Sequence, residues 1–164
     1  MIRGIHHLAV STIDLERAVA FYRDLLGFEL VTRFSWPKGS PAADRLLDLP
    51  DSAAQAALLS AGNAMIELFQ FESPTPKPGD PNRPVCDHGL AHLCILVSDL
   101  DEEYERLKTA GMKFHCPPQQ DRTMKVTYGR DPDGNVVELL EILSSRNPFS
   151  LKPRSQVIND RAPD

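Results

Sequence analysis

Apolar and polar residues follow two different periods along the chain, and each change of period marks an expected element. Residues 4–11 form a nearly continuous apolar run, which predicts a buried strand. In residues 15–26 the apolar positions recur at helical spacing, which predicts a helix with Asp14 as its cap. Gly27 follows this apolar stripe and is expected to end the helix.

The rest of the first half predicts three further strands and one short helix. Apolar runs place the strands at residues 28–34, 54–60 and 64–71. An irregular stretch follows the first of these strands, and a short helix is expected there at residues 41–47, with Ser40 as its cap. The order of elements is therefore β-α-β-β-β with a helical insertion.

A stretch rich in proline and charge, residues 73–88, follows this half and predicts a linker or long loop. A second strand–helix unit then begins with an apolar strand at residues 89–97. Its remaining elements are expected to be a helix from the cap Asp99 to Ala110, and strands at 112–116, 124–130 and 135–143. The sequence DPDG, which joins the last two strands, is a strong turn signal.

The two halves of the sequence repeat each other. An offset of 85 residues aligns Gly4 with Gly89, His7 with His92, and Asp14 with Asp99. The last strands of the halves, AMIELFQF and NVVELLEIL, also align and place Glu67 over Glu138. Repetition on this scale indicates that the chain arose by duplication of one module.

The predicted fold class is α+β, with two tandem βαβββ modules. The modules are expected at residues 1–72 and 89–143, joined by the linker 73–88 and followed by a C-terminal tail or arm at 144–164. We expect the curved sheets of the modules to form a cleft around a metal ion.

Four residues carry the candidate chemistry, one histidine and one glutamate in each half: His7, Glu67, His92 and Glu138. If the first and last strands of each module are neighbours, a twofold axis would bring all four side chains to one point. Two imidazoles and two carboxylates suit a divalent ion of Ni, Zn, Mn, Fe or Co. The adjacent His6 aligns with Ala91, and strand alternation predicts that it faces away from His7.

A simpler explanation exists for each of these residues taken alone. A histidine in an apolar strand is commonly a hydrogen-bonded core residue, and a glutamate in a strand commonly faces water. However, Glu67 and Glu138 lie between apolar residues, where an ionised carboxylate is costly to bury without a partner. Because all four residues also obey the repeat, the metal interpretation is favoured.

The sequence resembles the vicinal oxygen chelate superfamily, which includes glyoxalases, bleomycin-resistance proteins and extradiol dioxygenases. The likeness rests on the motifs GIHHLAVSTIDLERAVAFYRDLLGFEL, AMIELF, GLAHLCILVSDLD and DPDGNVVELLE. It covers roughly residues 4–143 and leaves the tail outside. The superfamily carries several chemistries on one metal platform, so the likeness implies the fold more strongly than the reaction.

The set His7, Glu67, His92 and Glu138 is most similar to the ligand set of glyoxalase I. That likeness implies a metal-dependent lyase or isomerase that transfers a proton next to a carbonyl through a metal-bound enediolate. It also implies that one glutamate is the base, and we favour Glu138, with Glu67 nearly equal. The alternatives are an epimerase, an Fe(II) ring-cleavage dioxygenase, or a non-catalytic protein that binds a small molecule.

Parts of the sequence depart from a compact glyoxalase. Segment 34–55 is longer than that fold needs, and only Arg33, Arg45 and Arg130 are candidates to bind the carboxylates of glutathione. The substrate is therefore expected to be a small carbonyl compound or thioester. Four aromatic residues are candidates to line an apolar pocket, although ordinary packing is the simpler explanation for each: Phe34, Trp36, Phe69 and Tyr128.

Composition and charge narrow the expected partners. The 164 residues carry a formal charge of -5, so no nucleic-acid partner is expected. No apolar run approaches the roughly 20 residues that cross a bilayer, so no membrane partner is expected either. The three cysteines lack CxxC spacing, which indicates reduced thiols in the cytoplasm. The resemblance also implies a homodimer.

Overall fold

The computed structural model describes residue 2 and residues 4–151, so most of the predicted tail, residues 152–164, lies outside the described part. The chain divides into two compact units. The first consists of Met1–Ala91 with Arg130–Asn135, and the second of His92–Gly129 with Val136–Asp164. These units group residues that contact each other in space, whereas the predicted modules are continuous stretches of sequence. The predicted module boundaries 1–72, 73–88, 89–143 and 144–164 therefore stay predictions.

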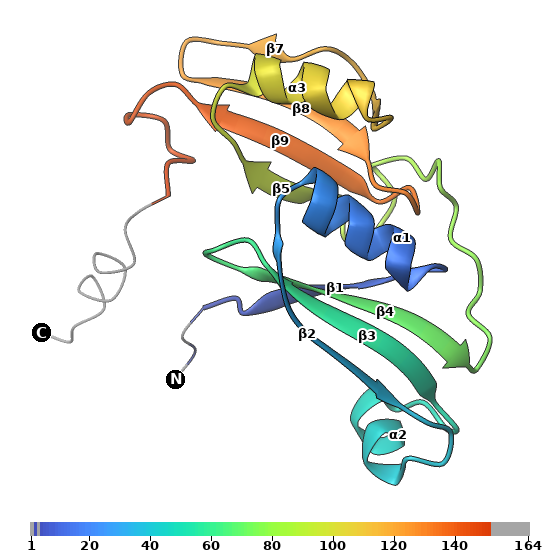
Figure 1. Ribbon diagram of the computed structural model, residues 1–164. Helices are drawn as coiled ribbons and strands as arrows, with labels where there is room; N and C mark the ends of the chain where they lie inside the picture. The colour runs from blue at the N-terminus through green and yellow to red at the C-terminus, as the bar shows by residue number, and fades with distance from the viewer. Residues whose placement is uncertain (1, 3, 152–164) are drawn as a thin grey trace, which may run out of the picture. The chain divides into compact units, whose positions relative to one another are not determined.

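The first unit contains a four-stranded mixed sheet (Figure 1). Its strands are β1 (His7–Ser11), β2 (Glu29–Trp36), β3 (Ala53–Ser60) and β4 (Met65–Ser73). Their order in space is β1-β4-β3-β2, with β1 parallel to β4 and the other two pairs antiparallel. The first and last strands of the unit are therefore hydrogen-bonded neighbours.

The predicted helix over residues 15–26 has two parts. It begins as α1 (Leu15–Val19) and continues as the π-helix η1 (Ala20–Leu25), where the Leu26 N–H donates to the Phe21 carbonyl. The cap prediction is confirmed, because the Asp14 carboxylate accepts a hydrogen bond from the Arg17 N–H at 3.0 Å. The second helix of the unit, α2 (Pro41–Leu47), has its predicted bounds, but Ser40 does not cap it and donates to the Pro37 carbonyl instead.

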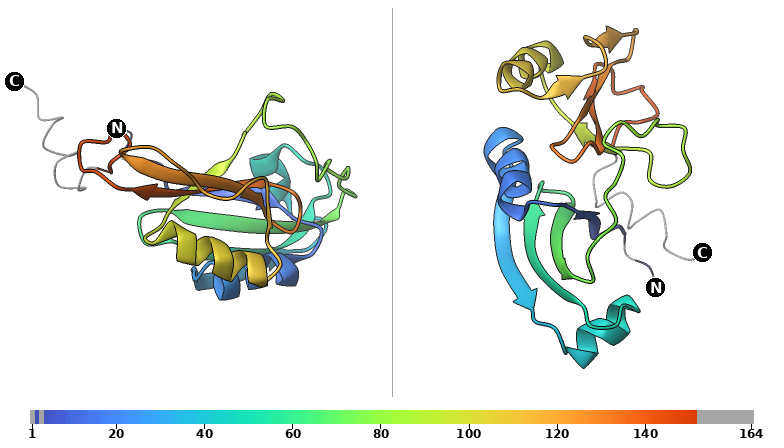
Figure 2. Two further views of the ribbon diagram at one scale, coloured as in Figure 1. Left: turned by 90° about the horizontal axis from the view of Figure 1, so that it is seen from above. Right: turned by 90° about the vertical axis from the view of Figure 1, so that its right-hand side faces the viewer.

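The sheet of the first unit has one buried and one half-buried face. Helix α1 packs on β3 and β4, on one side of the sheet (Figures 1 and 2). On the helix side, Ile66 and Leu68 of β4 are 2% and 0% exposed. Burial of each such side chain contributes about 1.5–3 kcal/mol to stability. On the other side, Glu67, Phe69 and Phe71 are only partly buried.

The second unit repeats this plan. Its strands are β5 (Leu93–Leu96), β6 (Lys113–Phe114), β7 (Gln119–Gln120), β8 (Met124–Arg130) and β9 (Val136–Ile142). The sheet order is β5-β9-β8-β6, with β7 paired to β8, and β5 is parallel to β9. Helix α3 (Leu100–Thr109) supplies Leu100 and Leu107 to the core, where they are 0% and 1% exposed.

The α+β prediction is confirmed, and each half has the βαβββ order. Two expectations about the strands of the second half are wrong. The strand expected at residues 89–97 is confined to β5, and the pair Gln119–Gln120 adds a strand in a predicted loop. No helix in the described part of the chain is long and apolar enough to cross a membrane.

Candidate metal centre

The first unit brings His7 and Glu67 together on the half-buried face of its sheet. Strands β1 and β4 pair in parallel, with Ala9 opposite Glu67. His7 lies two residues before Ala9 and therefore on the same face. The His7 Nε2 and Glu67 Oε2 atoms are 3.3 Å apart, with side chains 39% and 17% exposed.

The second unit brings His92 and Glu138 together in the same way. Strands β5 and β9 pair in parallel, with Cys94 opposite Glu138, and His92 lies two residues before Cys94. The His92 Nε2 and Glu138 Oε2 atoms are 3.0 Å apart, with side chains 35% and 15% exposed. The offset of 85 residues that relates His7 to His92 also relates Ala9 to Cys94. The sequence repeat therefore corresponds to a repeated strand register.

His6 contradicts the prediction that it faces away from His7. The Nδ1 atoms of the two rings are 2.8 Å apart, and the rings meet edge to face. The alternation rule fails here because β1 begins only at His7. Since His7 Nδ1 faces His6, the Nε2 atom is the one left to face Glu67. A partner on the second ring nitrogen commonly fixes the orientation of a ligating histidine.

The corresponding neighbour of His92 is Tyr128 of β8. The two rings meet edge to face at 5.4 Å, and the Tyr128 ring also stacks on His115 at 6.4 Å. Desolvation, together with the charge of Glu138 and a hydrogen bond to it, raises the pKa of Tyr128. Tyr128 therefore remains a neutral hydrogen-bond donor beside the His92–Glu138 pair.

Cys94, which lies opposite Glu138 in the strand register, is exposed. Partial desolvation and the neighbouring Glu138 carboxylate raise the pKa of its thiol to about 12. The thiolate that a nucleophile needs is therefore disfavoured at Cys94.

Each pair has the donor chemistry of half a metal site. An imidazole nitrogen and a carboxylate oxygen bound to one ion at roughly 2.1 Å, in adjacent positions, would lie about 3 Å from each other. The distances of 3.3 Å and 3.0 Å within the pairs agree with that spacing. In the described part of the chain, no three His, Cys, Asp or Glu side chains gather into a group that could hold a metal ion. The structure therefore shows the two pairs separately, and the four-ligand site stays a prediction.

Two of the three candidate arginines have structural partners. The Arg33 guanidinium donates to both carboxylate oxygens of Glu16, at 2.5 Å and 2.9 Å. Arg130 donates to the carbonyls of Gly134 and Arg83. Arg45 lies on α2 and is exposed. Neither Arg33 nor Arg130 is thus a ready anchor for a substrate carboxylate.

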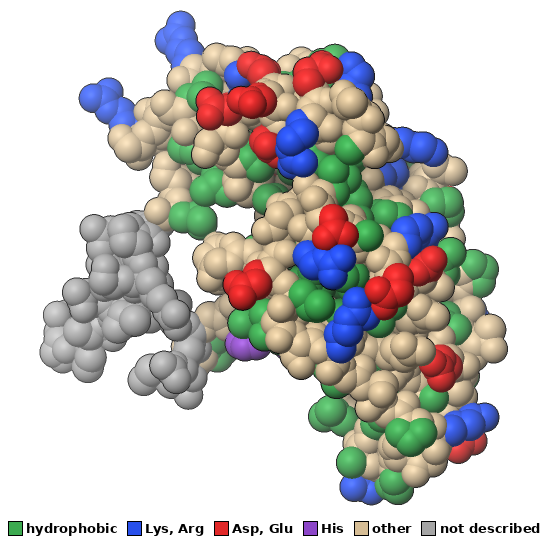
Figure 3. Space-filling model, in the orientation of Figure 1, with side chains coloured by type: hydrophobic (Ala, Val, Ile, Leu, Met, Phe, Trp, Pro, Cys, Tyr) green, Lys and Arg blue, Asp and Glu red, His purple; other side chains and the backbone are tan. Residues whose placement is uncertain are grey.

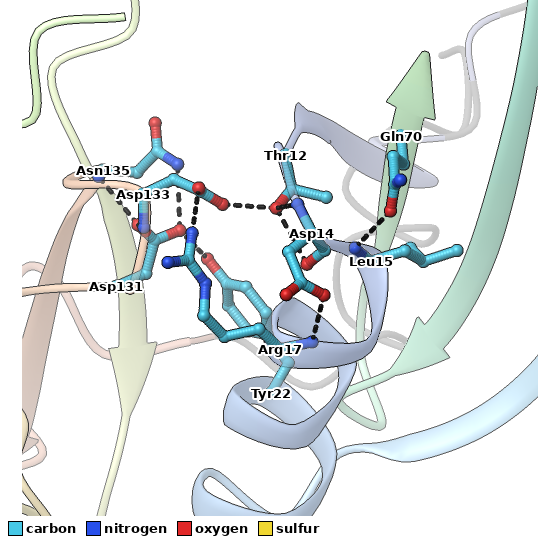
Figure 4. Close-up of polar contacts among 9 residues, drawn as sticks. All are labelled: Thr12, Asp14, Leu15, Arg17, Tyr22, Gln70, Asp131, Asp133 and Asn135. Carbon is cyan, nitrogen blue, oxygen red and sulfur yellow. Dashed lines mark hydrogen bonds and ion pairs between the residues drawn. The ribbon is translucent and has the colours of Figure 1, made fainter. Parts of the chain in front are cut away.

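The predicted DPDG turn does more than connect two strands. It belongs to the first unit, where the Tyr22 hydroxyl donates to Asp131 at 3.0 Å in a buried contact (Figure 4). Asp133 accepts hydrogen bonds from Arg17 and from the Thr12 hydroxyl, each at 2.5 Å. These contacts join residues more than 100 positions apart in sequence, so a local turn signal cannot reveal them.

Charged side chains of both signs are interspersed on the face shown in Figure 3. Lysine and arginine side chains lie there beside aspartate and glutamate side chains. The observation agrees with the net charge of -5.

Two βαβββ units with matching His–Glu pairs define a tandem-module protein with paired imidazole and carboxylate donors. The model of the Glyoxalase/Bleomycin resistance protein/Dioxygenase superfamily matches residues 4–139. The chain belongs to this superfamily, as the sequence motifs predict.

Individual relatives span the same range. The chain is 32% identical over 147 residues to the uncharacterised protein YaeR of Escherichia coli (strain K12), covering 85% of this chain and 97% of that one. It is 30% identical over 146 residues to a lactoylglutathione lyase of Pseudomonas aeruginosa, covering 83% and 81%. An ethylmalonyl-CoA/methylmalonyl-CoA epimerase of Cereibacter sphaeroides is 31% identical over 114 residues, covering 69% and 75%.

Solved structures agree on the fold. The crystal structure of a glyoxalase family protein from Bacillus cereus superposes with a TM-score of 0.79 over 88% of this chain and 97% of that chain. Its sequence identity is 22%, so the likeness concerns the fold alone.

Proposed function

We propose that the protein is a divalent-metal-dependent lyase or isomerase of the glyoxalase I type, which transfers a proton next to the carbonyl of a small carbonyl compound or thioester. The observation that carries the proposal is the repeated pair, His7 with Glu67 and His92 with Glu138, at the same strand register in both units. The similarity to a lactoylglutathione lyase supports the reaction type.

The four side chains would hold one ion of Ni, Zn, Mn, Fe or Co, with His7 binding through Nε2 because its Nδ1 faces His6. A bound divalent ion would supply Lewis-acid stabilisation of negative charge on substrate oxygens. His6 would fix the orientation of the His7 ring, and Tyr128 would fix the orientation of the His92 ring. Each carboxylate would compensate the charge of the ion.

Glu138 is the favoured general base, with Glu67 as the alternative. A base must be held within hydrogen-bond reach of the proton that it abstracts. Tyr128 and Cys94 both direct side-chain hydrogen bonds to Glu138, and these contacts would orient its carboxylate. In this role, Glu138 takes the proton from the carbon beside the carbonyl and returns it to a neighbouring carbon or to the same one.

An epimerase is the second candidate, because the relatives include an epimerase of acyl-CoA thioesters. A lyase or isomerase and an epimerase share the first proton transfer and differ in where the proton returns. The two remaining alternatives are outcomes of the test below. They are an Fe(II) ring-cleavage dioxygenase and a protein that sequesters a small molecule.

Proton exchange tests the proposal. Protein loaded in turn with Ni, Zn, Mn, Fe(II) or Co is incubated with hydroxyacetone in deuterated water, and loss of the α-proton signal is followed by NMR. We expect exchange with at least one metal, its loss with a chelator, and its loss in Glu138→Gln. Oxygen uptake with Fe(II) and a catechol, without exchange, would contradict the proposal in favour of a dioxygenase. Binding without either reaction would favour sequestration.

We propose further that the protein is a homodimer and that it acts in the cytoplasm. The three cysteines of the chain are free and exposed, which suits a reducing compartment. Sedimentation of the full chain at several concentrations tests the dimer, and a monomer at all concentrations would contradict it.

A further inference from the structure

The half-buried face of the first sheet carries four aromatic side chains that adjoin Glu67. We call them the aromatic wall: Phe34 and Trp36 of β2, and Phe69 and Phe71 of β4. Their ring centroids lie 5.7–6.4 Å apart in five neighbouring pairs. Such spacings are typical of favourable aromatic contacts.

The strand register explains why the four rings meet. On the central strand β3, Ala56 lies opposite both Phe34 and Phe69, and Ala54 lies opposite both Trp36 and Phe71. The alanine methyl groups are too small to separate the rings on either side. Both alanines are only 1% exposed. The rings therefore close over them and form one continuous apolar surface.

The aromatic wall is not the core of the unit. The core lies on the other face of the sheet, where Leu59 and Leu68 are 0% exposed. By contrast, Phe34 remains 41% exposed, and the other three rings are only partly buried. Rings held in mutual contact but left accessible to solvent are suited to bind another apolar group.

Trp36 is fixed by a chain of partly buried hydrogen bonds. Its indole Nε1 donates to the Ser52 hydroxyl at 2.9 Å, and that hydroxyl donates to the Asp44 carboxylate at 2.8 Å. Ser52 is 0% exposed. The helical insertion of segment 34–55, which a compact glyoxalase would not need, thus supplies Asp44 and holds the indole in place. A preorganised ring costs less entropy when a ligand binds.

The described strands of the first unit offer no lysine or arginine beside the wall. Besides His7, Glu67 and Glu29, their register places on this face the four rings and the neutral residues Ser11, Thr32, Ala9, Ala54, Ala56, Leu58, Ser60 and Met65. Arg33, the nearest cation in sequence, lies on the opposite face and is paired with Glu16. Two residues along a strand span roughly 7 Å, so the backbone positions of Glu67 and Phe69 are about 7 Å apart and their side chains lie on the same face.

We propose that the aromatic wall binds the apolar or aromatic substituent of the substrate, so that the substrate is an aryl or otherwise apolar α-hydroxycarbonyl compound and not a charged peptide thioester. This inference rests on the proposed function, because it places the carbonyl at the His7–Glu67 pair. The wall itself acts by shape and hydrophobic contact and needs no metal.

Trp36 is the only tryptophan of the chain, so its fluorescence reports on the wall directly. The probe is 2-hydroxyacetophenone, and hydroxyacetone is its matched analogue without the ring. In chelator-treated full-length protein, we expect saturable quenching by the aryl ketone and none by hydroxyacetone. Phe34→Ala is expected to weaken binding by three- to tenfold, about the worth of one aromatic contact. Phe34→Leu is a second variant, which keeps the apolar volume and should lose part of the affinity.

Phe149→Ala is the control, since it removes an exposed phenylalanine from the other unit and should leave binding unchanged. Equal quenching by both ketones, absence of saturation, or unchanged affinity in Phe34→Ala would overturn the inference. A change in sedimentation of Phe34→Ala with unchanged binding would overturn it in favour of contact with a second copy of the chain. Failure of the proposed function is distinguishable, since it abolishes metal-dependent exchange of hydroxyacetone and leaves metal-free quenching intact.

Discussion

Gln70 and Glu141 perform the same task in the two units. The Gln70 Oε1 atom accepts a hydrogen bond from the Leu15 N–H at 2.7 Å, and the Glu141 carboxylate accepts one from the Leu100 N–H at 3.1 Å. Both acceptors lie three residues after the glutamate of the candidate metal centre. The same strand thus presents a candidate ligand on one face and caps the helix from the other.

Gln70→Ala should destabilise the protein by about 1–2 kcal/mol, because it leaves a backbone donor at a helix start without its acceptor. Urea unfolding followed by circular dichroism measures the effect. Gln55→Ala is the matched control, because Gln55 makes its hydrogen bond to Glu72 on the exposed surface. The control should change stability by less than about 0.5 kcal/mol. Equal effects of the two variants would refute the capping role.

Tyr22→Phe should cost about 1–2 kcal/mol, since it removes the donor of a buried hydrogen bond to the Asp131 carboxylate. Asp131 also accepts from the backbone of Asp133 and Asn135, so the turn itself should persist. Tyr104→Phe is the control, in a tyrosine of helix α3 that is also buried but packs on Phe114. Thermal unfolding compares the two variants, and no difference between them would contradict the importance of the Tyr22–Asp131 contact.

Gly134→Ala should destabilise the protein by about 2–5 kcal/mol, which combines strain at positive φ with a steric clash. Gly134 has φ +90°, and a Cβ atom there would lie 2.3 Å from the Pro81 Cα. Gly62→Ala separates the two effects, because Gly62 has φ +86° and open space around it. That control should lose only about 1–2 kcal/mol. Similar losses in chemical denaturation would show that Pro81 is not packed on the turn.

Asp44 should make stability depend on acid pH. Hydrogen bonds from the Ser52 side chain and backbone lower the pKa of Asp44 below its ordinary value of 3.8. The unfolded state therefore binds the proton first, and the stabilisation is present above pH 3.8 and lost as the pH falls through the lowered pKa. Asp44→Asn should flatten this dependence, and Trp36 emission measures unfolding.

Asp48→Asn is the matched control for this experiment, because Asp48 ends the same helix in a left-handed conformation that asparagine tolerates. It should keep the acid dependence of the parent protein. An identical pH profile for Asp44→Asn and the parent would contradict the assignment to Asp44.

The sequence predicts those helices and strands in which enough residues follow the apolar pattern to define its period. Helix α2 and strand β8 have their predicted bounds. His7, Glu67 and Glu138 lie on strands that pair as neighbours, and His92 directly precedes β5. The two-residue strand β7 could not be predicted, since two residues define no period. The π-helical part of the first helix was also hidden, because its apolar stripe fits both helix types.

The structure also differs from the sequence prediction at the Asp99 cap and at His6. Asp99 is a residue type that often caps helices, but its φ of 52° is left-handed and its side chain makes no cap. Glu141, more than 40 residues away in sequence, accepts the hydrogen bonds of that helix start instead. The His6–His7 contact escaped prediction because the alternation rule applies only inside the strand.

The central claim is that both His–Glu pairs serve one metal ion, and metal stoichiometry tests it most directly. Metal content of the full chain is measured after equilibration with Zn, Ni, Co, Mn or Fe(II), for the parent, His7→Ala and His92→Ala. His88→Ala, in a loop, is the control. We predict one ion per parent chain, and a loss of affinity in either candidate variant that exceeds the roughly 100-fold effect of removing an outer-shell partner. Two ions in the parent and one in each variant, or metal content unchanged by both substitutions, would contradict a shared centre.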